Sequence, residues 1–209
     1  MDDLLPGYRR FRARIWPARR ERLEELAARG QHPRTLVIAC ADSRVSPTMI
    51  FDAAPGELFV VRNVAALVPP CRPDAAVHGT SAAVEFAVLG LGVDRIVVLG
   101  HGGCGGVQAL LAGPEALPGG SGFLPTWMRL AAAARARALT CDVPERQLAC
   151  EHATVEVSLD NLMTFPWVAE RVAAGRLRLL GAHFDIATGT LAIRDATGRF
   201  VPVAADSAA

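Results

Sequence analysis

Two apolar runs of this chain end in residues that bind soft metal ions. The run at 96–99 is followed by His101 and Cys104 among five glycines, and the run at 35–39 is followed by Cys40. An imidazole and a thiolate three residues apart can reach one metal ion, and the glycines let the backbone bend around it. The sequence therefore offers three possible ligands for one metal site.

The elements before these residues must bring them together. Short apolar runs bounded by glycine are typical of buried strands in a parallel sheet, and ligands gather beyond the carboxyl ends of such strands. Two thiolates and one imidazole favour zinc over calcium, magnesium or an iron–sulfur cluster, and three protein ligands leave a fourth position open, as in catalytic zinc sites. The alternative is that Cys40 is a small buried apolar residue and Cys104 a packed thiol in a turn.

The rest of the pattern alternates strands and helices, which predicts an α/β fold. We expect a central, mostly parallel β-sheet of about four parallel strands with an antiparallel edge strand, flanked by helices. We expect a single domain over 1–209, with a helical arm at 1–30 that packs on the domain or a neighbouring subunit, a catalytic core at 31–203 and a frayed tail at 204–209. The predicted strands are 35–39, 58–62, 95–99, 176–184, 190–194 and 199–203, and the predicted helices are 1–30, 47–51, 79–91, from 110 to a loop at 114–122, 124–139, 145–165 and 166–175.

Composition argues against several classes of protein, namely nucleic-acid-binding, membrane and secreted proteins. A net charge of +1 gives no reason to expect a nucleic-acid or membrane partner. The acidic start and the early arginines argue against a signal peptide, and no apolar run is long enough for a membrane span. Five cysteines, an odd number, suit a reducing compartment, so we expect a cytoplasmic protein with free or metal-binding thiols.

The residues at the two strand ends resemble the β-class carbonic anhydrases. The resemblance rests on Cys40-x-Asp42-x-Arg44 and His101-x-x-Cys104, and it spans residues 31–195. It includes Pro55-Gly56-Glu57, Arg62-Asn63 and Cys104-Gly105-Gly106. It implies that Cys40, His101 and Cys104 bind one zinc ion per subunit, that Asp42 and Arg44 form a catalytic dyad, and that zinc-bound hydroxide hydrates carbon dioxide reversibly to bicarbonate and a proton.

A dyad of this kind makes physical sense beside such a ligand set. Two thiolates formally cancel the charge of zinc, so the ion acidifies water less than one bound by three neutral imidazoles. Asp42 lies close enough in the sequence to Cys40 to accept a hydrogen bond from zinc-bound water and to orient it. Arg44 can pair with Asp42, keep it ionised and draw it away from the metal; without that pair, Asp42 could itself occupy the fourth position. The alternative is an ordinary ion pair at a strand end.

The resemblance also implies a substrate pocket. Its residues are Gln31, Phe59, Val64, Phe86 and Gly105, with Phe86 standing where tyrosine is usual. The apolar members suit a small uncharged linear substrate, and Gln31 offers an amide donor. Core packing is the alternative for Val64 and Phe86. In the family this pocket is shared across a dimer interface, so we expect a homodimer or a dimer of dimers whose active site lies at the subunit interface.

A departure from some bacterial relatives bears on regulation. Those relatives bind inhibitory bicarbonate with a tryptophan, an arginine and a tyrosine, whose positions correspond to Val37, Arg62 and Phe184 here. Only the arginine is kept. We therefore hypothesise that this protein lacks the inhibitory site and that Asp42 and Arg44 stay paired at neutral pH.

Several residues and functions remain open at this stage. Cys71, Cys141 and Cys150 are best interpreted as free thiols, and His183 as a satisfied core or surface imidazole and not a proton shuttle. Rival functions are hydrolysis of carbon disulfide or carbonyl sulfide on the same fold, and a non-catalytic zinc-binding or redox-sensing protein. Asp42 and Arg44 argue against the latter, because a structural zinc site needs no group that orients water.

Overall fold

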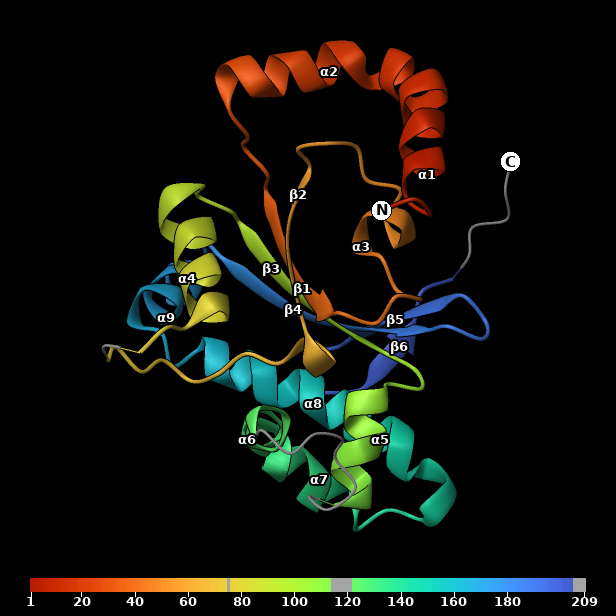
Figure 1. Cartoon of the computed structure of the whole chain (residues 1–209). Coiled ribbons are helices and arrows are strands. Elements are labelled where there is room, and N and C mark those ends of the chain that lie inside the picture. Colours follow the sequence, from red (N-terminus) through yellow and green to blue (C-terminus); the bar gives the residue numbers. More distant parts are fainter. Residues whose placement is uncertain (75, 114–121, 205–209) are drawn as a thin grey trace.

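One sheet with four parallel and two antiparallel strands organises this protein (Figure 1). The computed structural model describes residues 1–74, 76–113 and 122–204, and in this part of the chain the strand order is β2-β1-β3-β4-β5-β6. β2, β1, β3 and β4 are parallel, whereas β5 and β6 are antiparallel to their neighbours. The strands are β1 (Thr35–Cys40), β2 (Leu58–Asn63), β3 (Arg95–His101), β4 (Arg178–Asp185), β5 (Thr190–Arg194) and β6 (Phe200–Pro202).

The predicted α/β class is confirmed, with one difference at the antiparallel edge. The strands predicted at 190–194 and 199–203 are both present as β5 and β6, and they pair antiparallel across the turn at 195–198, so two antiparallel strands stand where one antiparallel edge strand is expected. The helices are α1 (Leu5–Arg10), α2 (Trp16–Arg29), α3 (Pro47–Ile50), α4 (Gly79–Glu85), α5 (Gly105–Ala112), α6 (Phe123–Met128), α7 (Ala132–Ala138), α8 (Arg146–Leu162) and α9 (Pro166–Ala173). Shorter helical turns are η1 (Phe11–Ile15), η2 (Val64–Ala66), η3 (Phe86–Gly90), η5 (Arg129–Ala131) and η6 (Val143–Glu145).

The N-terminal helices extend away from the sheet as an arm (Figure 1). α1, η1 and α2 contain no buried residue, and apolar Leu5, Tyr8 and Ile15 are exposed. α2 ends at Gly30, whose φ of 82° is easily adopted only by glycine. The arm reaches the body at Gly56, where a Cβ atom would lie 2.8 Å from Leu26 Cδ2. Most of the arm's apolar surface therefore has no partner within the described chain.

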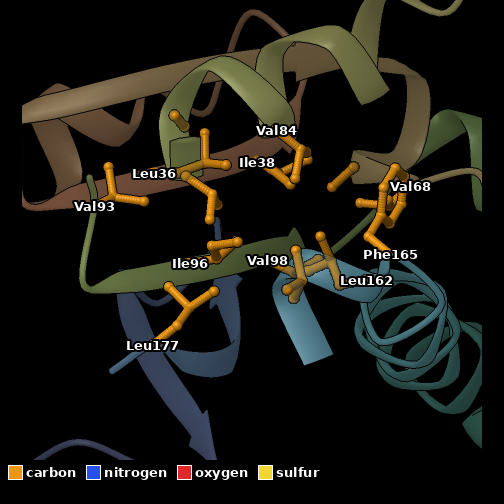
Figure 2. Packing of buried hydrophobic residues seen from close by; sticks show 14 of the residues in the cluster. Leu36, Ile38, Val68, Val84, Val93, Ile96, Val98, Leu162, Phe165 and Leu177 are labelled. Atoms are coloured by element: carbon orange, nitrogen blue, oxygen red, sulfur yellow. The ribbon is translucent and has the colours of Figure 1, made fainter. Parts of the chain in front are cut away.

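The main core lies between the sheet and helices α4, α8 and α9. Alternate residues of the central strands, such as Leu36 in β1 and Ile96 in β3, point to this side and are fully buried. Figure 2 shows them meeting Val84 from the α4 side and Leu162 from α8. The other face of the sheet carries a smaller cluster that includes Val37, and a third cluster joins α5, α6, α7 and α8. Burial on both faces explains why β1 and β3 are almost continuously apolar.

The helices differ from the sequence prediction in three places. α5 begins at Gly105, five residues before the predicted helix at 110, because the chain turns directly from Cys104 into it. The helix predicted over 124–139 is interrupted by the turn η5, and the one over 79–91 ends in the wider turn η3. The predicted loop at 114–122 lies outside the described residues except for Gly122, and so does the predicted frayed tail except for Ala204. Among the described helices, none combines the length and apolar character that crossing a bilayer requires.

Candidate metal centre

The three predicted ligands meet at the carboxyl edge of the parallel sheet. Cys40 ends β1, His101 ends β3, and Cys104 is the N-cap of α5. β1 and β3 are paired neighbours, so both strands deliver their last residue to the same edge. One ligand atom from each residue lies within 4.8 Å of the others, and all three residues are at most 5% exposed. Gly103, with a φ of 64°, makes the turn that returns Cys104 to His101.

The imidazole of His101 is prepared for a metal ion. Its Nδ1 lies 3.0 Å from the carbonyl oxygen of Gly102, which can only accept, so Nδ1 carries the proton and Nε2 keeps its lone pair. Nε2 is buried and has no hydrogen-bond partner within the part of the chain that the structure describes. A buried polar atom without a partner is costly, and a metal ion at this position would satisfy it.

The two thiols point to the same conclusion. Hydrogen bonding between them lowers the pKa of Cys40 and, together with burial, raises the pKa of Cys104 above its usual range. Two thiolates so close together repel each other, and a cation between them allows both to ionise. Two sulfurs and one imidazole nitrogen are donors that fit zinc.

A backbone group also approaches this cluster. The N–H of Ala65, in the turn η2, lies 3.4 Å from the Sγ of Cys40 and donates to it. Ala65 has a φ of 64° and Ala66 a φ of 53°, both in the left-handed region that residues with a Cβ rarely adopt. This conformation costs about 1–2 kcal/mol per residue, and it directs an N–H toward a sulfur that carries negative charge. The sequence offers no signal for it.

Asp42 and Arg44 form a closed pair at the open side of the cluster. The backbone N–H and Nε of Arg44 each donate to Oδ1 of Asp42 at 2.9 Å, and Nη2 donates to Oδ2 at 2.7 Å. Arg44 Nη2 also donates to the carbonyl of Gly103 at 3.0 Å, which ties the two ligand-bearing loops together. Hydrogen bonds from Arg44 keep the pKa of Asp42 well below its usual range. Oδ2 of Asp42 lies 3.9 Å from Nε2 of His101, so an ionised carboxylate faces the ligands.

Known proteins with the same fold and sequence pattern are carbonic anhydrases. A family model described as Carbonic anhydrase matches residues 35–191. The structure of the β-carbonic anhydrase CcaA is similar to this chain with a TM-score of 0.89 and 31% identity, covering 99% of this chain and 93% of that one. One of two tetrameric β-carbonic anhydrases from Sordaria macrospora has a TM-score of 0.76 and 31% identity, covering 90% of this chain and 93% of that one. The chain belongs to the β-carbonic anhydrase family.

A curated plant relative agrees with this assignment. Beta carbonic anhydrase 3 of Arabidopsis thaliana is 40% identical over 169 residues, which are 78% of this chain and 65% of the relative. The chain thus spans slightly less than two thirds of that relative's length. β-Carbonic anhydrases use zinc, and the cluster of Cys40, His101 and Cys104 is consistent with one zinc site.

The residues predicted to bind substrate lie in several places. The rings of Phe59 and Phe86 are 5.8 Å apart between centroids, and Phe86 is half exposed. Val64 is 37% exposed, and it lies next to the ligand cluster because the N–H of the following residue, Ala65, donates to Sγ of Cys40. Gly105 is the exposed first residue of α5, and Gln31 is exposed in the segment between α2 and β1. Their roles as substrate-binding residues remain predictions.

A large open hollow among the described residues lies beside the metal centre and not in it. Its volume is about 1060 Å³, and it reaches the site only at Val64. The indole Nε1 of Trp127 donates to the carbonyl of Val64 at 2.8 Å and so fixes this wall. Other lining residues include Asn63, Thr80, Phe123 and Leu130. This hollow is a broad apolar surface, too large for a three-atom substrate.

Arg62 braces the loop that carries Asp42. Its Nε donates to the carbonyl of Cys40 at 2.9 Å, and its Nη2 donates to the carbonyls of Asp42 and Val45. At the two other positions compared with the inhibitory bicarbonate site, Val37 is fully buried and Phe184 packs against apolar neighbours. Arg62 thus supports the loop through three carbonyl groups. The hydrogen-bonded pair of Asp42 and Arg44 agrees with the hypothesis that the two residues stay paired at neutral pH. The absence of an inhibitory bicarbonate site remains a prediction.

Glu151 is a polar residue that the sequence prediction missed. It lies in α8, is 3% exposed, and accepts the backbone N–H of Cys104 at 3.0 Å. Gln147 and His183 bond to the same carboxylate at 2.6 and 3.0 Å. Burial raises the pKa of Glu151, but these hydrogen bonds outweigh it and leave the pKa below its usual range. His183 is thus a satisfied core imidazole, as predicted, and its partner is Glu151.

One pattern in the sequence does point to this network. Gln147, Glu151, Thr154 and Ser158 recur at spacings of four, three and four, which places them on one face of a helix. Most of the residues between them are apolar, and three of the four are fully or almost fully buried. A polar stripe inside a buried helix must find hydrogen-bond partners, so it indicates a buried network, although not its partners.

Proposed function

We propose that this protein is a zinc-dependent carbonic anhydrase that interconverts carbon dioxide and bicarbonate. The observation that carries the proposal is the carboxylate of Asp42, held by Arg44 with one oxygen 3.9 Å from Nε2 of the ligand His101. Family membership supports it, because 75% of the chain, residues 35–191, matches the family model. A bound zinc ion would lower the pKa of a water molecule and so supply the nucleophile that carbon dioxide needs.

The roles of the nearby residues follow from their donors and acceptors. Asp42 accepts a hydrogen bond from the attacking water and so directs a lone pair of that water toward carbon. Arg44 uses its forked N–H groups to keep Asp42 ionised and to hold its carboxylate out of the fourth ligand position. Val64, Phe59 and Phe86 provide apolar walls suited to an uncharged linear molecule, and Gln31 provides an amide donor for one of its oxygens.

We also propose that two subunits complete each active site. Gln31 and Phe86 are exposed, and the arm of α1, η1 and α2 leaves its apolar side chains without partners in the described chain. The large hollow beside Val64 offers an apolar surface for a partner subunit. Relatives from Sordaria macrospora are tetrameric, which supports a dimer or a dimer of dimers. Each subunit is then a single domain with an N-terminal clasping arm.

A cytoplasmic location is part of the same proposal. All five cysteines are free, including two that lie outside the buried core. Proteins of oxidising compartments usually pair such thiols, whereas a reducing compartment keeps them free.

The test combines metal analysis with stopped-flow assays of carbon dioxide and carbonyl sulfide on the purified protein. We expect about one zinc per subunit and rapid hydration of carbon dioxide. Asp42→Asn should retain zinc and lose activity by about 10²–10³-fold, because the amide cannot accept and orient in the same way. Asp160→Asn is the matched control, since Asp160 is exposed on α8 and has no side-chain hydrogen bond among the described residues.

Two outcomes would overturn the proposal. Stoichiometric zinc with no hydration of carbon dioxide at any pH would favour a non-catalytic zinc protein. Hydrolysis of carbonyl sulfide without hydration of carbon dioxide would favour the sulfur substrates.

A further inference from the structure

A second carboxylate, that of Glu151, lies buried against the backbone of the ligand Cys104. Glu151 projects from α8 and bonds three donors at once. Oε1 accepts the N–H of Cys104 at 3.0 Å and the amide of Gln147 at 2.6 Å, and Oε2 accepts Nε2 of His183 at 3.0 Å. Side chains of both Glu151 and His183 are at least 95% buried. The carboxylate therefore connects α8, β4 and the start of α5.

Gln147 extends the contact to the other end of the same residue. Gln147 lies one helical turn before Glu151 in α8. Its side-chain Nε2 lies 3.5 Å from the carbonyl oxygen of Cys104. Two side chains of α8 thus contact both the N–H and the C=O of Cys104. A residue held at both backbone groups has little freedom to move its sulfur.

The close approach of α8 is built into the sheet. A Cβ atom at Gly100 would lie only 2.7 Å from Cγ2 of Val155, so any larger residue would push α8 away from β3. The space left between Glu151 and the ligands is a cavity of about 10 Å³, which has no room for more than one water molecule. Substrate cannot reach Glu151 from this side, so the residue acts through Cys104.

We propose that Glu151 is a positioning residue for the zinc ligand Cys104, and that His183 and Gln147 keep its carboxylate in place. The inference rests on the proposed function only through zinc binding. It assigns to α8 a direct influence on how tightly the metal is retained.

The chemistry of the network requires a carboxylate. All three neighbours present N–H groups, and an ionised carboxylate is the one side-chain group of this shape that only accepts. Glutamine has the same size, but its NH₂ group would face one of these donors. Glu151→Gln therefore removes the charge that strengthens all three hydrogen bonds, and its NH₂ group meets the N–H of Gln147 or His183 unless the His183 ring moves its proton to Nδ1.

The test measures how fast a chelator removes zinc from the loaded protein. We expect Glu151→Gln to lose zinc about 10–100-fold faster than the wild type, the range typical when a group that orients a metal ligand is removed. The cobalt-substituted protein should also show altered thiolate-to-cobalt absorption bands, because the sulfur of Cys104 is less well fixed. Neither readout requires turnover, so both remain informative if the enzyme does not hydrate carbon dioxide.

Glu156→Gln is the matched control. Glu156 lies in the same helix and pairs with Arg137 and Arg194 at 3.0 Å, away from the ligands. Its substitution should lower stability and leave the cobalt spectrum and the rate of zinc loss unchanged. If Glu151→Gln behaves like Glu156→Gln in both measurements, the proposal is wrong.

A second pair of variants tests the network without changing Glu151. His183→Phe keeps a ring in the core and removes the donor to Oε2, so it should accelerate zinc loss several-fold. His183→Gln restores a donor and should bring the rate back toward that of the wild type. Equal rates of zinc loss for His183→Phe and the wild type would also overturn the proposal, even if Glu151→Gln failed to fold.

Discussion

Two carboxylates lie beside the metal centre, one at its partly exposed front and one at its buried rear, and they are held in opposite ways. Asp42, at the front, has a side chain that is 16% exposed and is paired with an arginine whose side chain is 53% exposed. Glu151, at the rear, has a side chain that is 2% exposed, and its partners are a backbone N–H, Gln147 and His183. Both carboxylates are ionised, and hydrogen bonds lower the pKa of each.

The difference shows how surroundings assign a role to a carboxylate. A group at the front has to exchange partners with water and substrate, and an ion pair with an exposed arginine is weak enough to permit that. A group at the rear has to remain fixed, and burial makes every lost hydrogen bond expensive. The front should therefore control turnover, and the rear should control retention of the metal and stability.

The largest effect on activity should come from removing a zinc ligand, because both carboxylates act through the bound metal. Cys104→Ser replaces a thiolate by a hydroxyl, which is a poor donor to zinc. We expect the zinc content to fall well below one per subunit and the activity to fall by at least ~10³-fold. Atomic absorption and stopped-flow assays measure the two quantities.

This variant also sharpens the comparison between front and rear. In a Cys104→Ser background, neither Asp42→Asn nor Glu151→Gln should reduce activity further, because both residues act through a complete metal site. An additional loss of the size seen in the wild-type background would mean that one of the carboxylates works independently of the metal. Cys141→Ser, at a thiol outside the site, is the control and should retain both zinc and activity.

A smaller effect should follow from releasing the front carboxylate. Arg44→Gln removes the forked donors from Asp42 and the link to the carbonyl of Gly103. The freed carboxylate, 3.9 Å from the imidazole of His101, can then turn toward the ligands and compete with water. We expect about a 10–100-fold loss of kcat/KM with little change in the rate of zinc loss, because the misplaced carboxylate no longer orients the attacking water while all three ligands remain in place.

The opposite result, faster zinc loss with unchanged activity, would contradict the roles assigned to the two carboxylates. If Arg44→Gln released zinc as fast as Glu151→Gln while keeping its activity, the front would be the structural side of the site. Arg129→Gln is a suitable control, because Arg129 bonds only to Thr126 among the described side chains.

The sequence predicts the front of the site much better than the rear. Cys40, Asp42 and Arg44 follow one apolar run within five residues, and His101 and Cys104 follow another, so local pattern and the rule for parallel sheets suffice to bring them together. The same rule predicts the order of strands and helices, because buried parallel strands are almost continuously apolar. Exact helix starts, such as that of α5 at Gly105, depend on turns that pattern does not specify.

The rear depends on contacts between residues far apart in the chain. Glu151 and Cys104 are separated by 47 positions and Glu151 and His183 by 32, with no motif to connect them. The left-handed conformation of Ala65 is equally hidden, because alanine gives no sign of a positive φ. These features arise from packing of α8 and η2 against the sheet, which only the folded structure displays.

The smallest effect that we expect is a loss of free energy of unfolding in acid, and it should arise at His152, next to His183 in the buried rear of the site. His152 stacks on Phe200 with centroids 4.0 Å apart and meets the edge of His183 at 4.8 Å. Burial, and then the neighbouring His183, lower the pKa of His152 to about 4. Between pH 6.5 and 4 the unfolded chain binds a proton that the folded chain does not, so the free energy of unfolding falls as the pH falls through this range. The loss should reach roughly 2 kcal/mol at pH 5, by the energy equivalent of a pKa shift.

His152→Phe removes the titrating group and keeps a ring against Phe200, so the variant should lose less stability than the wild type between pH 7.5 and 5. Urea unfolding at the two pH values measures this, and the comparison between variants cancels the titration of the zinc ligands, which both proteins share. Asp42 contributes little to the slope in this range, because its carboxyl group stays ionised above about pH 5 both in the unfolded chain, with its ordinary pKa, and in the folded one, with a lower pKa. His32→Phe, at an exposed position, should leave the slope unchanged. If His152→Phe and the wild type lose equal stability, the weakness in acid does not arise at His152, and the neighbourhood of Glu151 is less sensitive to protons than its burial implies.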